Sequence, residues 1–92
     1  MAFLRSERDT MTTETPQVDE TLDTSGLLCP LPVYKAGMAL GNLEAGQVLQ
    51  LICTDPGSLE DIPAMARQRG DILVASDERE GTQVFWIEKG KA

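Results

Sequence analysis

The sequence predicts an α+β fold: a two-layer α/β sandwich in which a four-stranded mixed sheet carries two helices on one face. Two segments place apolar residues at helical spacing, and four shorter segments are typical of strands, in the order β-α-β-α-β-β. The first two strands are each followed by a helix, which favours parallel pairing between them. A short turn joins the last two strands, so we expect these to pair antiparallel.

The length of 92 residues suits one domain and leaves no room for a second. Residues 1–17 are polar and show no hydrophobic period, so they are predicted to form a disordered tail. Residues 18–92 are predicted to form the folded domain. The sequence leaves open whether translation starts at Met1 or at Met11.

The first strand and the first helix are predicted from the start of this domain. Residues 18–24 alternate in the manner of a short strand, and the turn signal Ser25-Gly26 ends them. A helix is predicted over residues 30–43, with Pro30 at its first position, where a missing N–H costs nothing. One face of this helix carries its apolar residues, Val33, Ala36, Leu40 and Leu43.

The next strand and the second helix follow. Residues 47–53 are mostly apolar and predict a buried strand. After a loop, Ser58 and Asp61 resemble a capping box at the start of a helix that ends at Gly70. Because Pro63 lies early in this segment, we expect the regular helix to begin near Asp61.

The last two strands are predicted over residues 71–76 and 82–88, with a hairpin turn at 78–81. Phe85 and Trp86 are neighbours on the final strand, so their side chains point to opposite faces of the sheet. One of them is expected beneath the helices and the other on the open face.

The composition excludes several classes of function. With 15 acidic and 8 basic residues the formal net charge is −7, which argues against nucleic acids or anionic membranes as partners. There is no histidine and there are only two cysteines, so His-paired nucleophiles and a structural zinc site are not expected. No apolar run approaches the roughly 20 residues of a transmembrane helix, and the start is not typical of a signal peptide. A cytoplasmic protein is therefore expected.

Cys29 is the candidate nucleophile of this sequence. With Pro30 as the first helical residue, Cys29 becomes the N-cap, and the positive end of the helix is expected to lower the pKa of its thiol. Gly26 permits a sharp turn before the thiol, and Pro30 and Pro32 stiffen the chain after it. The N–H groups of Leu31 and Val33 are expected to donate hydrogen bonds to the sulfur. The residues predicted to shape the site in these ways are Gly26, Pro30, Leu31, Pro32 and Val33.

The residue types alone leave alternatives open. Cys29 is explained equally well as a half-buried small apolar residue, and Cys53, at the end of an apolar strand, is predicted to be structural. Asp55 and Asp61 form a candidate carboxylate pair, although a turn and a helix cap are favoured for them. Lys35 is a candidate for steering an anionic donor, with a solvated helix face as the favoured interpretation.

The motif Cys29-Pro30-Leu31-Pro32-Val33 resembles the Cys-Pro-x-Pro motif of the TusA/SirA family of small sulfur-transfer proteins. The resemblance covers residues 22–89, and the family fold is a two-layer α/β sandwich that agrees with the order of elements above. Further matching segments are Leu22-Asp23, Gly26-Leu27, Leu43, Gly46, Thr54-Asp55-Pro56-Gly57-Ser58 and Asp61-Ile62-Pro63.

The resemblance implies a sulfur carrier, a sulfurtransferase that works with partner proteins. Cys29 would accept sulfane sulfur as a persulfide from a cysteine desulfurase or a rhodanese-like protein and relay it to an acceptor protein. The pathways implied are tRNA thiolation, molybdenum cofactor supply and inorganic sulfur metabolism. No cofactor is expected beyond the transient persulfide, and Asp55 becomes a candidate docking residue near the thiol.

Partner identity stays open at this point. Some members of the family carry several basic residues on the first helix, whereas here Lys35 is the only one. We expect a monomer or weak dimer without direct contact to nucleic acid or membrane. The alternative functions are a thiol-based redox sensor, which the same low thiol pKa would serve, and a regulatory protein-binding module.

Overall fold

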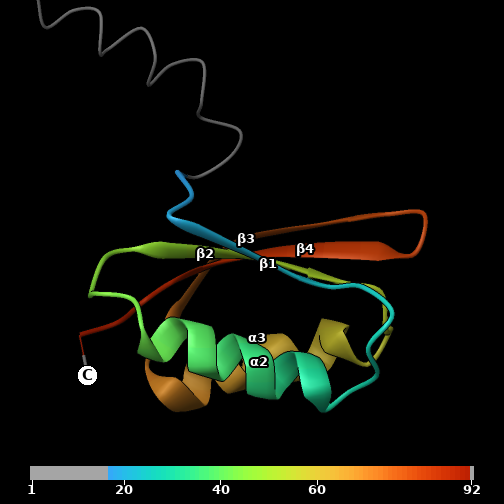
Figure 1. Ribbon diagram of the computed structural model, residues 1–92, viewed down its shortest axis with the longest axis horizontal. Helices are drawn as coiled ribbons and strands as arrows, with labels where there is room; N and C mark the ends of the chain where they lie inside the picture. Colours follow the sequence, from blue (N-terminus) through green and yellow to red (C-terminus); the bar gives the residue numbers. More distant parts are fainter. Residues whose placement is uncertain (1–16, 92) are drawn as a thin grey trace, which may run out of the picture.

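The computed structural model describes residues 17–91, which form a layer of strands against a layer of two helices (Figure 1). The predicted element order and the two-layer α+β fold are confirmed. In chain order the elements are β1 (Glu20–Thr24), α2 (Leu31–Gly41), β2 (Val48–Cys53), α3 (Ser58–Arg69), β3 (Ile72–Arg79) and β4 (Thr82–Glu88).

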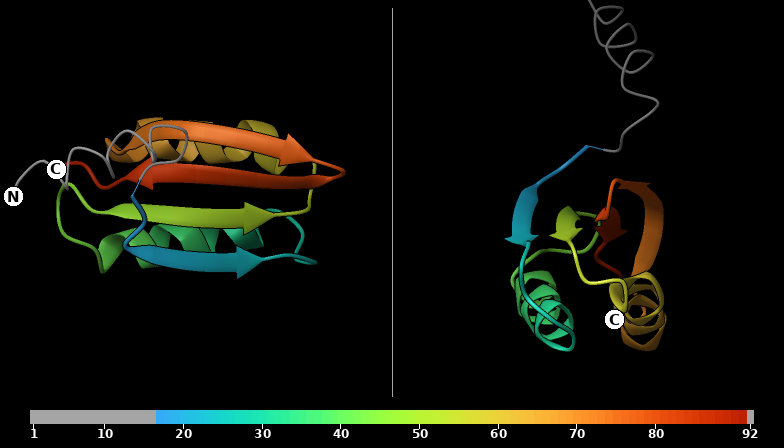
Figure 2. Two further views of the ribbon diagram at one scale, coloured as in Figure 1. Left: turned by 90° about the horizontal axis from the view of Figure 1, so that it is seen from above. Right: turned by 90° about the vertical axis from the view of Figure 1, so that its right-hand side faces the viewer.

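The four strands are arranged in the order β1-β2-β4-β3. Strands β1 and β2 pair in parallel, whereas β4 pairs antiparallel with β2 and with β3, so the sheet is mixed as predicted. Both helices cover one face: α2 packs below β1 and β2, and α3 packs below β3 and β4 (Figure 2). The opposite face of the sheet carries no helix from the described part of the chain.

The core lies between the sheet and the two helices. Alternate residues of the two central strands face the helices and are buried there. Burial of each such Leu, Ile or Phe side chain contributes roughly 1.5–3 kcal/mol, which holds the two layers together. The core includes Leu49 and Leu51 of β2, Phe85 and Ile87 of β4, Ala36 and Leu40 of α2, and Ile62 of α3.

Phe85 and Trp86 point to opposite faces of the sheet, as predicted. Phe85 is buried beneath the helices, and Trp86 is half-buried on the open face. The Trp86 Nε1–H donates a hydrogen bond of 3.1 Å to Oε1 of Gln50, its register partner on β2. The indole is therefore fixed to the sheet by a polar contact as well as by packing.

Helix α2 ends at Gly41, two residues before the predicted end. The ammonium group of Lys89, which follows β4, donates hydrogen bonds to the carbonyl oxygens of Leu40 and Leu43 over 2.8 and 3.3 Å. A cation at this end of a helix satisfies free carbonyl groups and opposes the helix dipole. Lys89 thus ties the carboxyl end of α2 to the sheet.

Helix α3 begins at Ser58, so the predicted start near Asp61 and the capping box are both wrong. Gly57 is the N-cap, and no side chain caps the first turn. Pro63 lies inside the helix, where its missing N–H removes one helical hydrogen bond. Burial of the neighbouring Ile62 holds this turn against the sheet.

Strand β3 runs to Arg79 rather than to residue 76. Its charged last three residues pair with the start of β4, and the turn consists of Glu80 and Gly81 alone. Both turn residues have positive φ, 51° and 84°, as a two-residue hairpin requires. The pattern missed this extension because both faces of the strand carry exposed side chains there.

The predicted tail, residues 1–17, lies outside the described residues except for Gln17, and it stays a prediction. Within residues 17–91, neither helix has the length and apolar character to cross a membrane. The cytoplasmic location also stays a prediction.

Candidate functional site

Cys29 lies in the loop between β1 and α2, at the edge of the sheet where the parallel strands β1 and β2 both end (Figure 2). The loop after β2 lies beside it, and two hydrogen bonds join the two loops. The Gly26 N–H donates to Oγ1 of Thr54 over 2.8 Å, and the Cys29 N–H donates to Oδ2 of Asp55 over 2.9 Å. The backbone of the thiol residue is thereby anchored to a segment far away in the sequence.

The start of helix α2 differs from the prediction by one residue. The N-cap is Pro30, whose φ and ψ of −97° and 16° are not helical, so Cys29 precedes the cap. The Leu31 N–H donates to the carbonyl oxygen of Leu28 over 2.9 Å. The N–H groups of Leu31 and Val33 were expected to serve the sulfur, and this turn uses that of Leu31.

The sulfur instead lies at the start of helix α3. Its Sγ atom is 3.5 Å from Oγ of Ser58, the first residue of α3, whose side chain is fully buried. A methyl group added to Gly57 would lie 3.8 Å from Sγ, so the backbone of the N-cap is next to the sulfur as well. The half-buried Cys29 thiol therefore faces the positive end of the second helix rather than that of its own.

The surroundings as a whole favour the neutral thiol. Burial raises the pKa of Cys29 above its ordinary value; the hydrogen bond with Ser58 acts in the opposite direction, and Asp55 and Asp61 raise the pKa further. The prediction of a lowered pKa is therefore wrong, because partial burial and the two carboxylates outweigh the hydrogen bond with Ser58. The pKa of Asp55 is itself lowered, chiefly because the Cys29 N–H donates to it.

The remaining predicted site residues lie in the turn before the motif and on helix α2. Gly26, with a φ of 84°, forms the turn before the motif as predicted. Pro32 is buried and Val33 packs against the core, so both anchor α2 to the sheet. Lys35 is exposed on α2, and its role in steering a donor stays a prediction.

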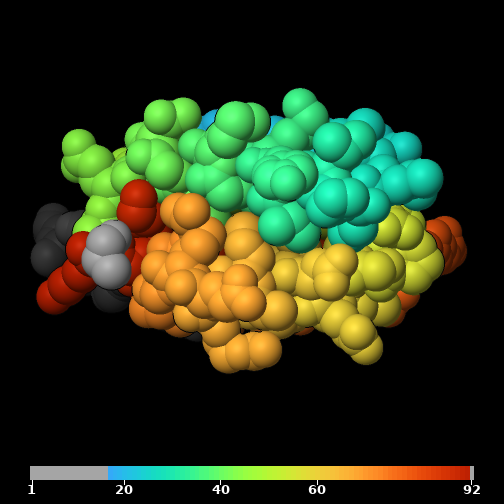
Figure 3. Space-filling model, turned by 90° about the horizontal axis from the view of Figure 1, so that it is seen from below, coloured from blue at the N-terminus to red at the C-terminus, as the bar shows by residue number. Residues whose placement is uncertain are grey.

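Exposed apolar side chains flank Cys29 along the chain. Leu28 and Leu31, on either side of the motif, are 69% and 46% exposed. Figure 3 shows the helix face of the molecule, where α2 and α3 lie side by side. A groove of about 300 Å³ between these helices is lined by Pro30, the residue after Cys29, and by Val33, Asp61, Ala64, Met65 and Gln68.

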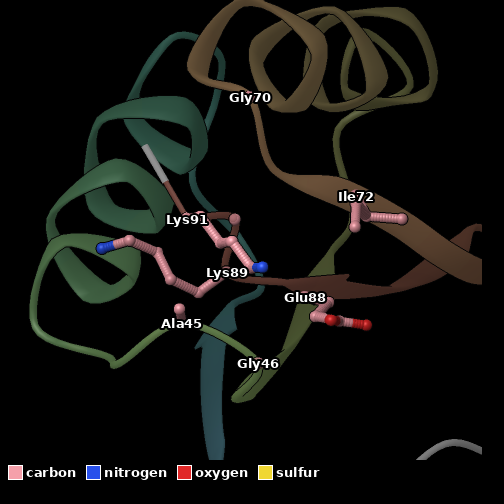
Figure 4. A pocket seen from close by; sticks show the side chains of 8 residues that line it. Ala45, Gly46, Gly70, Ile72, Glu88, Lys89 and Lys91 are labelled. Atoms are coloured by element: carbon pink, nitrogen blue, oxygen red, sulfur yellow. The ribbon is translucent and has the colours of Figure 1, made fainter.

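A second hollow, of about 430 Å³, lies at the carboxyl end of α2, the end of this helix remote from Cys29 (Figure 4). Lys89 and Lys91 contribute to its wall. Because Lys89 already donates to the carbonyl oxygen of Leu40 in α2 and to that of Leu43 just beyond the helix, this hollow is explained by the packing of residues 89–91 against the end of α2. Among residues 17–91, no three Cys, Asp or Glu side chains gather in a way that would hold a metal ion.

Ser58, Thr54 and Gly57 contact the site without having been predicted as site residues. In the matching segment that contains them, the resemblance pointed to Asp55 alone as a residue near the thiol, and Ser58 lies 29 residues from Cys29 in the sequence. The available signal was topological: loops that follow adjacent parallel strands meet at one edge of the sheet.

The model of the family described as Sulfurtransferase TusA matches residues 20–89, which include both loops and every helix and strand of the structure. The chain belongs to the TusA family. The resemblance inferred from the sequence is thus confirmed.

Individual relatives agree with this assignment. The chain is 48% identical to the sulfur carrier protein TusA of Allochromatium vinosum over 77% of its own length and 93% of that protein. It is 40% identical to the putative sulfur carrier protein YrkI of Bacillus subtilis, over 78% and 96% of the two chains. The crystal structure of a SirA-like protein from Desulfitobacterium hafniense superimposes with a TM-score of 0.70 at 31% identity, covering 79% of this chain and all of that one.

Proposed function

We propose that this protein is a sulfur carrier in which Cys29 accepts a sulfane sulfur as a persulfide and passes it to a partner protein. Membership of the TusA family supports the carrier role. The observation that carries the assignment to Cys29 is its position: a half-buried thiol, anchored through its own N–H, at the edge where two loops meet. A partner's sulfur can reach this atom without entering the protein.

The chemistry needs no oxidant or reductant. The Cys29 thiolate attacks the outer sulfur of a donor persulfide, a new S–S bond forms to Sγ, and the donor's S–S bond breaks. The electron pair of the broken bond leaves on the donor's inner sulfur as a thiolate. In the second step an acceptor thiolate attacks the outer sulfur on Cys29, and Sγ leaves as a thiolate. No cofactor takes part beyond the persulfide itself.

The solitary thiol suits a carrier. A second thiol within reach would attack the inner sulfur of the persulfide, form a disulfide and expel the cargo. The other cysteine, Cys53, is fully buried in β2, where the Thr24 hydroxyl lies 3.5 Å from its sulfur. It therefore cannot reach solvent or the persulfide without unfolding of the sheet, which supports its structural role.

The raised pKa of the thiol favours a carrier over a redox sensor. Cysteines that sense peroxide are typically acidic and accessible, because the thiolate is the form that is oxidised. Here burial and two carboxylates keep most of the thiol protonated. Activation would then come from the partner, whose cationic groups can neutralise Asp55 and Asp61 in the complex.

The proposed partners are a sulfur-donor protein, either a cysteine desulfurase or a rhodanese-like protein, and a sulfur-acceptor protein. The exposed apolar residues beside Cys29, such as Leu28 and Leu31, support docking through a protein surface, because transfer brings the two sulfur atoms into contact and covers these side chains. Asp55 is proposed as the docking residue closest to the thiol. The pathways proposed are tRNA thiolation, molybdenum cofactor supply and inorganic sulfur metabolism.

The test is intact-protein mass spectrometry after incubation with each class of donor. Reduced wild type, Cys29→Ser and Cys53→Ala are treated with a cysteine desulfurase plus cysteine, and separately with a rhodanese plus thiosulfate. We expect a gain of one sulfur atom that reductant removes, present in wild type and Cys53→Ala and absent from Cys29→Ser. Loading of Cys29→Ser, or loading by neither donor, would contradict the proposal.

A further inference from the structure

The hydroxyl group of Ser58 is fully buried, and the sulfur of Cys29 is the hydrogen-bond partner that the structure gives it, at 3.5 Å. Thr24 is a useful comparison. Its hydroxyl is also buried, but it donates to the backbone carbonyl of Ile52, which is a structural role. A buried hydroxyl normally finds a partner inside the protein, and for Ser58 that partner is the reacting atom.

We propose that Ser58 is a catalytic residue of sulfur transfer, whose hydroxyl donates a hydrogen bond to Sγ of Cys29 whenever that sulfur is a thiolate. The inference rests on the proposed carrier function. A serine hydroxyl can rotate, so it accepts from or donates to a neutral thiol but can only donate to a thiolate. A hydrogen bond to an ionised acceptor is roughly twice as strong as one between neutral groups, so the contact favours the thiolate.

The thiolate of Cys29 occurs twice in the transfer cycle. It is the nucleophile when the outer sulfur of the donor is taken up, and it is the leaving group when the acceptor removes that sulfur. In between, Sγ is bonded to two atoms and carries no charge, so the contact with Ser58 is weakest in the loaded state. Ser58 therefore assists both steps without stabilising the persulfide that lies between them.

The contact with Ser58 matters because the charged groups around the sulfur disfavour the thiolate. The charged groups that act on Sγ are Asp55, in the loop after β2, and Asp61, on α3, and both oppose the thiolate. Ser58 is the side chain that counteracts them, and it does so from the first residue of α3, where the helix end adds a favourable field.

The test compares Ser58→Ala, Ser58→Thr and the control Ser76→Ala, which removes a hydroxyl from an exposed position on β3. The rate of alkylation of Cys29 by iodoacetamide is measured from pH 6 to 11, with the label located by peptide mass spectrometry. In Ser58→Ala we expect the apparent pKa to rise by about one unit and the rate near pH 7 to fall about tenfold. The limiting rate at high pH should not change.

Ser76→Ala should show the wild-type pH profile, because it is remote from the thiol. Ser58→Thr retains the hydroxyl, so its profile should stay closer to wild type than that of Ser58→Ala, although its added methyl group enters a fully buried position. Transfer of sulfur from a persulfide donor should fall in Ser58→Ala in proportion to the thiolate fraction. A wild-type pH profile in a folded Ser58→Ala protein would overturn the proposal, and so would an equal loss of rate at every pH, which a merely structural role would give. Circular dichroism establishes folding, and Ser58→Gly provides a second variant without the hydroxyl.

The alkylation experiment needs no sulfur donor, which separates the two proposals. If Ser58→Ala shifts the pH profile but wild type is never loaded with sulfur, the carrier function fails and with it the catalytic role of Ser58. If wild type is loaded normally and Ser58→Ala shows neither a shifted profile nor slower transfer, the Ser58 proposal alone fails.

Discussion

The backbone N–H of Cys29 donates a hydrogen bond to Oδ2 of Asp55 over 2.9 Å, so the residue that holds the thiol loop in place also puts a negative charge beside the thiol. The two effects oppose each other in function. The tether orients the sulfur, whereas the charge disfavours the thiolate that must attack. Substitutions at Asp55 can separate them.

Asp55→Asn should make Cys29 more reactive. The amide oxygen can still accept the Cys29 N–H, but the charge is gone. A unit charge about 4 Å away in a solvated setting is worth about 1 kcal/mol, so we expect the thiol pKa to fall by roughly half a unit or slightly more. The pH dependence of alkylation measures this shift. Asp55→Ala, which also removes the tether, is the matched variant, and equal profiles for both would show that the hydrogen bond contributes nothing to orientation.

The same carboxylate should make stability depend on pH in acid. The pKa of Asp55 is lowered in the folded protein, chiefly by the Cys29 N–H. The contribution of the Asp55 carboxylate to folding stability is therefore fully present above its pKa in the unfolded chain, about 3.9. This contribution is lost as the pH falls through the lower pKa of the folded protein. Urea unfolding of wild type and Asp55→Asn between about pH 2 and 6 tests this. Wild type should lose stability relative to the variant as the pH falls, and a constant difference across this range would contradict the assignment.

Gly57→Ala should hinder access to the thiol. Its new methyl group would lie 3.2 Å from Oδ2 of Asp55 and 3.8 Å from Sγ of Cys29. The first distance is tighter than an ordinary contact, so the Asp55 carboxylate has to move by a few tenths of an ångström. We expect alkylation and sulfur loading to fall severalfold while the fold is kept, because Gly57 has a φ of −61°, which alanine adopts readily.

Gly41→Ala is the control for that experiment. It lies in helix α2 with nothing within 4 Å of the added methyl group, so it should stabilise the protein by roughly 0.5–1 kcal/mol and leave the reactivity of Cys29 unchanged. Wild-type reactivity in Gly57→Ala would show that the loop adjusts without cost.

Gln83→Met should raise the stability of the domain. Gln83 is buried on β4, and its Oε1 atom has no hydrogen-bond partner among the described residues. Such an orphaned group costs about 1–3 kcal/mol, and methionine has a similar shape without the polar atom. A gain of about 1 kcal/mol would raise the thermal midpoint by roughly 4–8 °C.

Gln50→Met is the matched control for this thermal unfolding experiment, because it removes a side-chain oxygen that does have a hydrogen-bond partner. Its Oε1 accepts the Trp86 indole N–H, so the substitution should lower stability by about 0.5–1.5 kcal/mol. Equal shifts in the two variants would indicate that burial alone, and not the missing partner, determines the cost.

The order of elements, the mixed sheet and the opposite facing of Phe85 and Trp86 were all predictable, because hydrophobic periodicity and the short final turn determine them locally. The ends of the helices and strands were less predictable. The charged end of β3 is a strand because it pairs with β4, and α2 ends at Gly41, where Lys89 donates to the carbonyl oxygen of Leu40 in its last turn. Both depend on contacts between segments distant in the sequence.

Cys29 was found as the candidate thiol from its motif, but its electrostatic setting was not. The sequence places a helix directly after Cys29, which suggested a lowered pKa. The folded chain brings Asp55, Ser58 and Asp61 to the sulfur from the other side, and their effects decide the direction. The meeting of two loops could be inferred from the parallel pairing of β1 and β2, but the side chains that face the sulfur depend on the exact start of α3.

The most direct test of the account is a complete transfer cycle on the isolated protein. Cys29 is loaded by a donor, the donor is removed, and an acceptor thiol is added while intact mass and the peptide that contains Cys29 are followed by mass spectrometry. The account predicts one extra sulfur atom on Cys29, stable until the acceptor is added, and then its loss as a free Cys29 thiol reappears and the acceptor gains the sulfur. Persistence of the sulfur on Cys29 in the presence of acceptors, or its appearance on Cys53, would contradict the proposal that Cys29 is the carrier site.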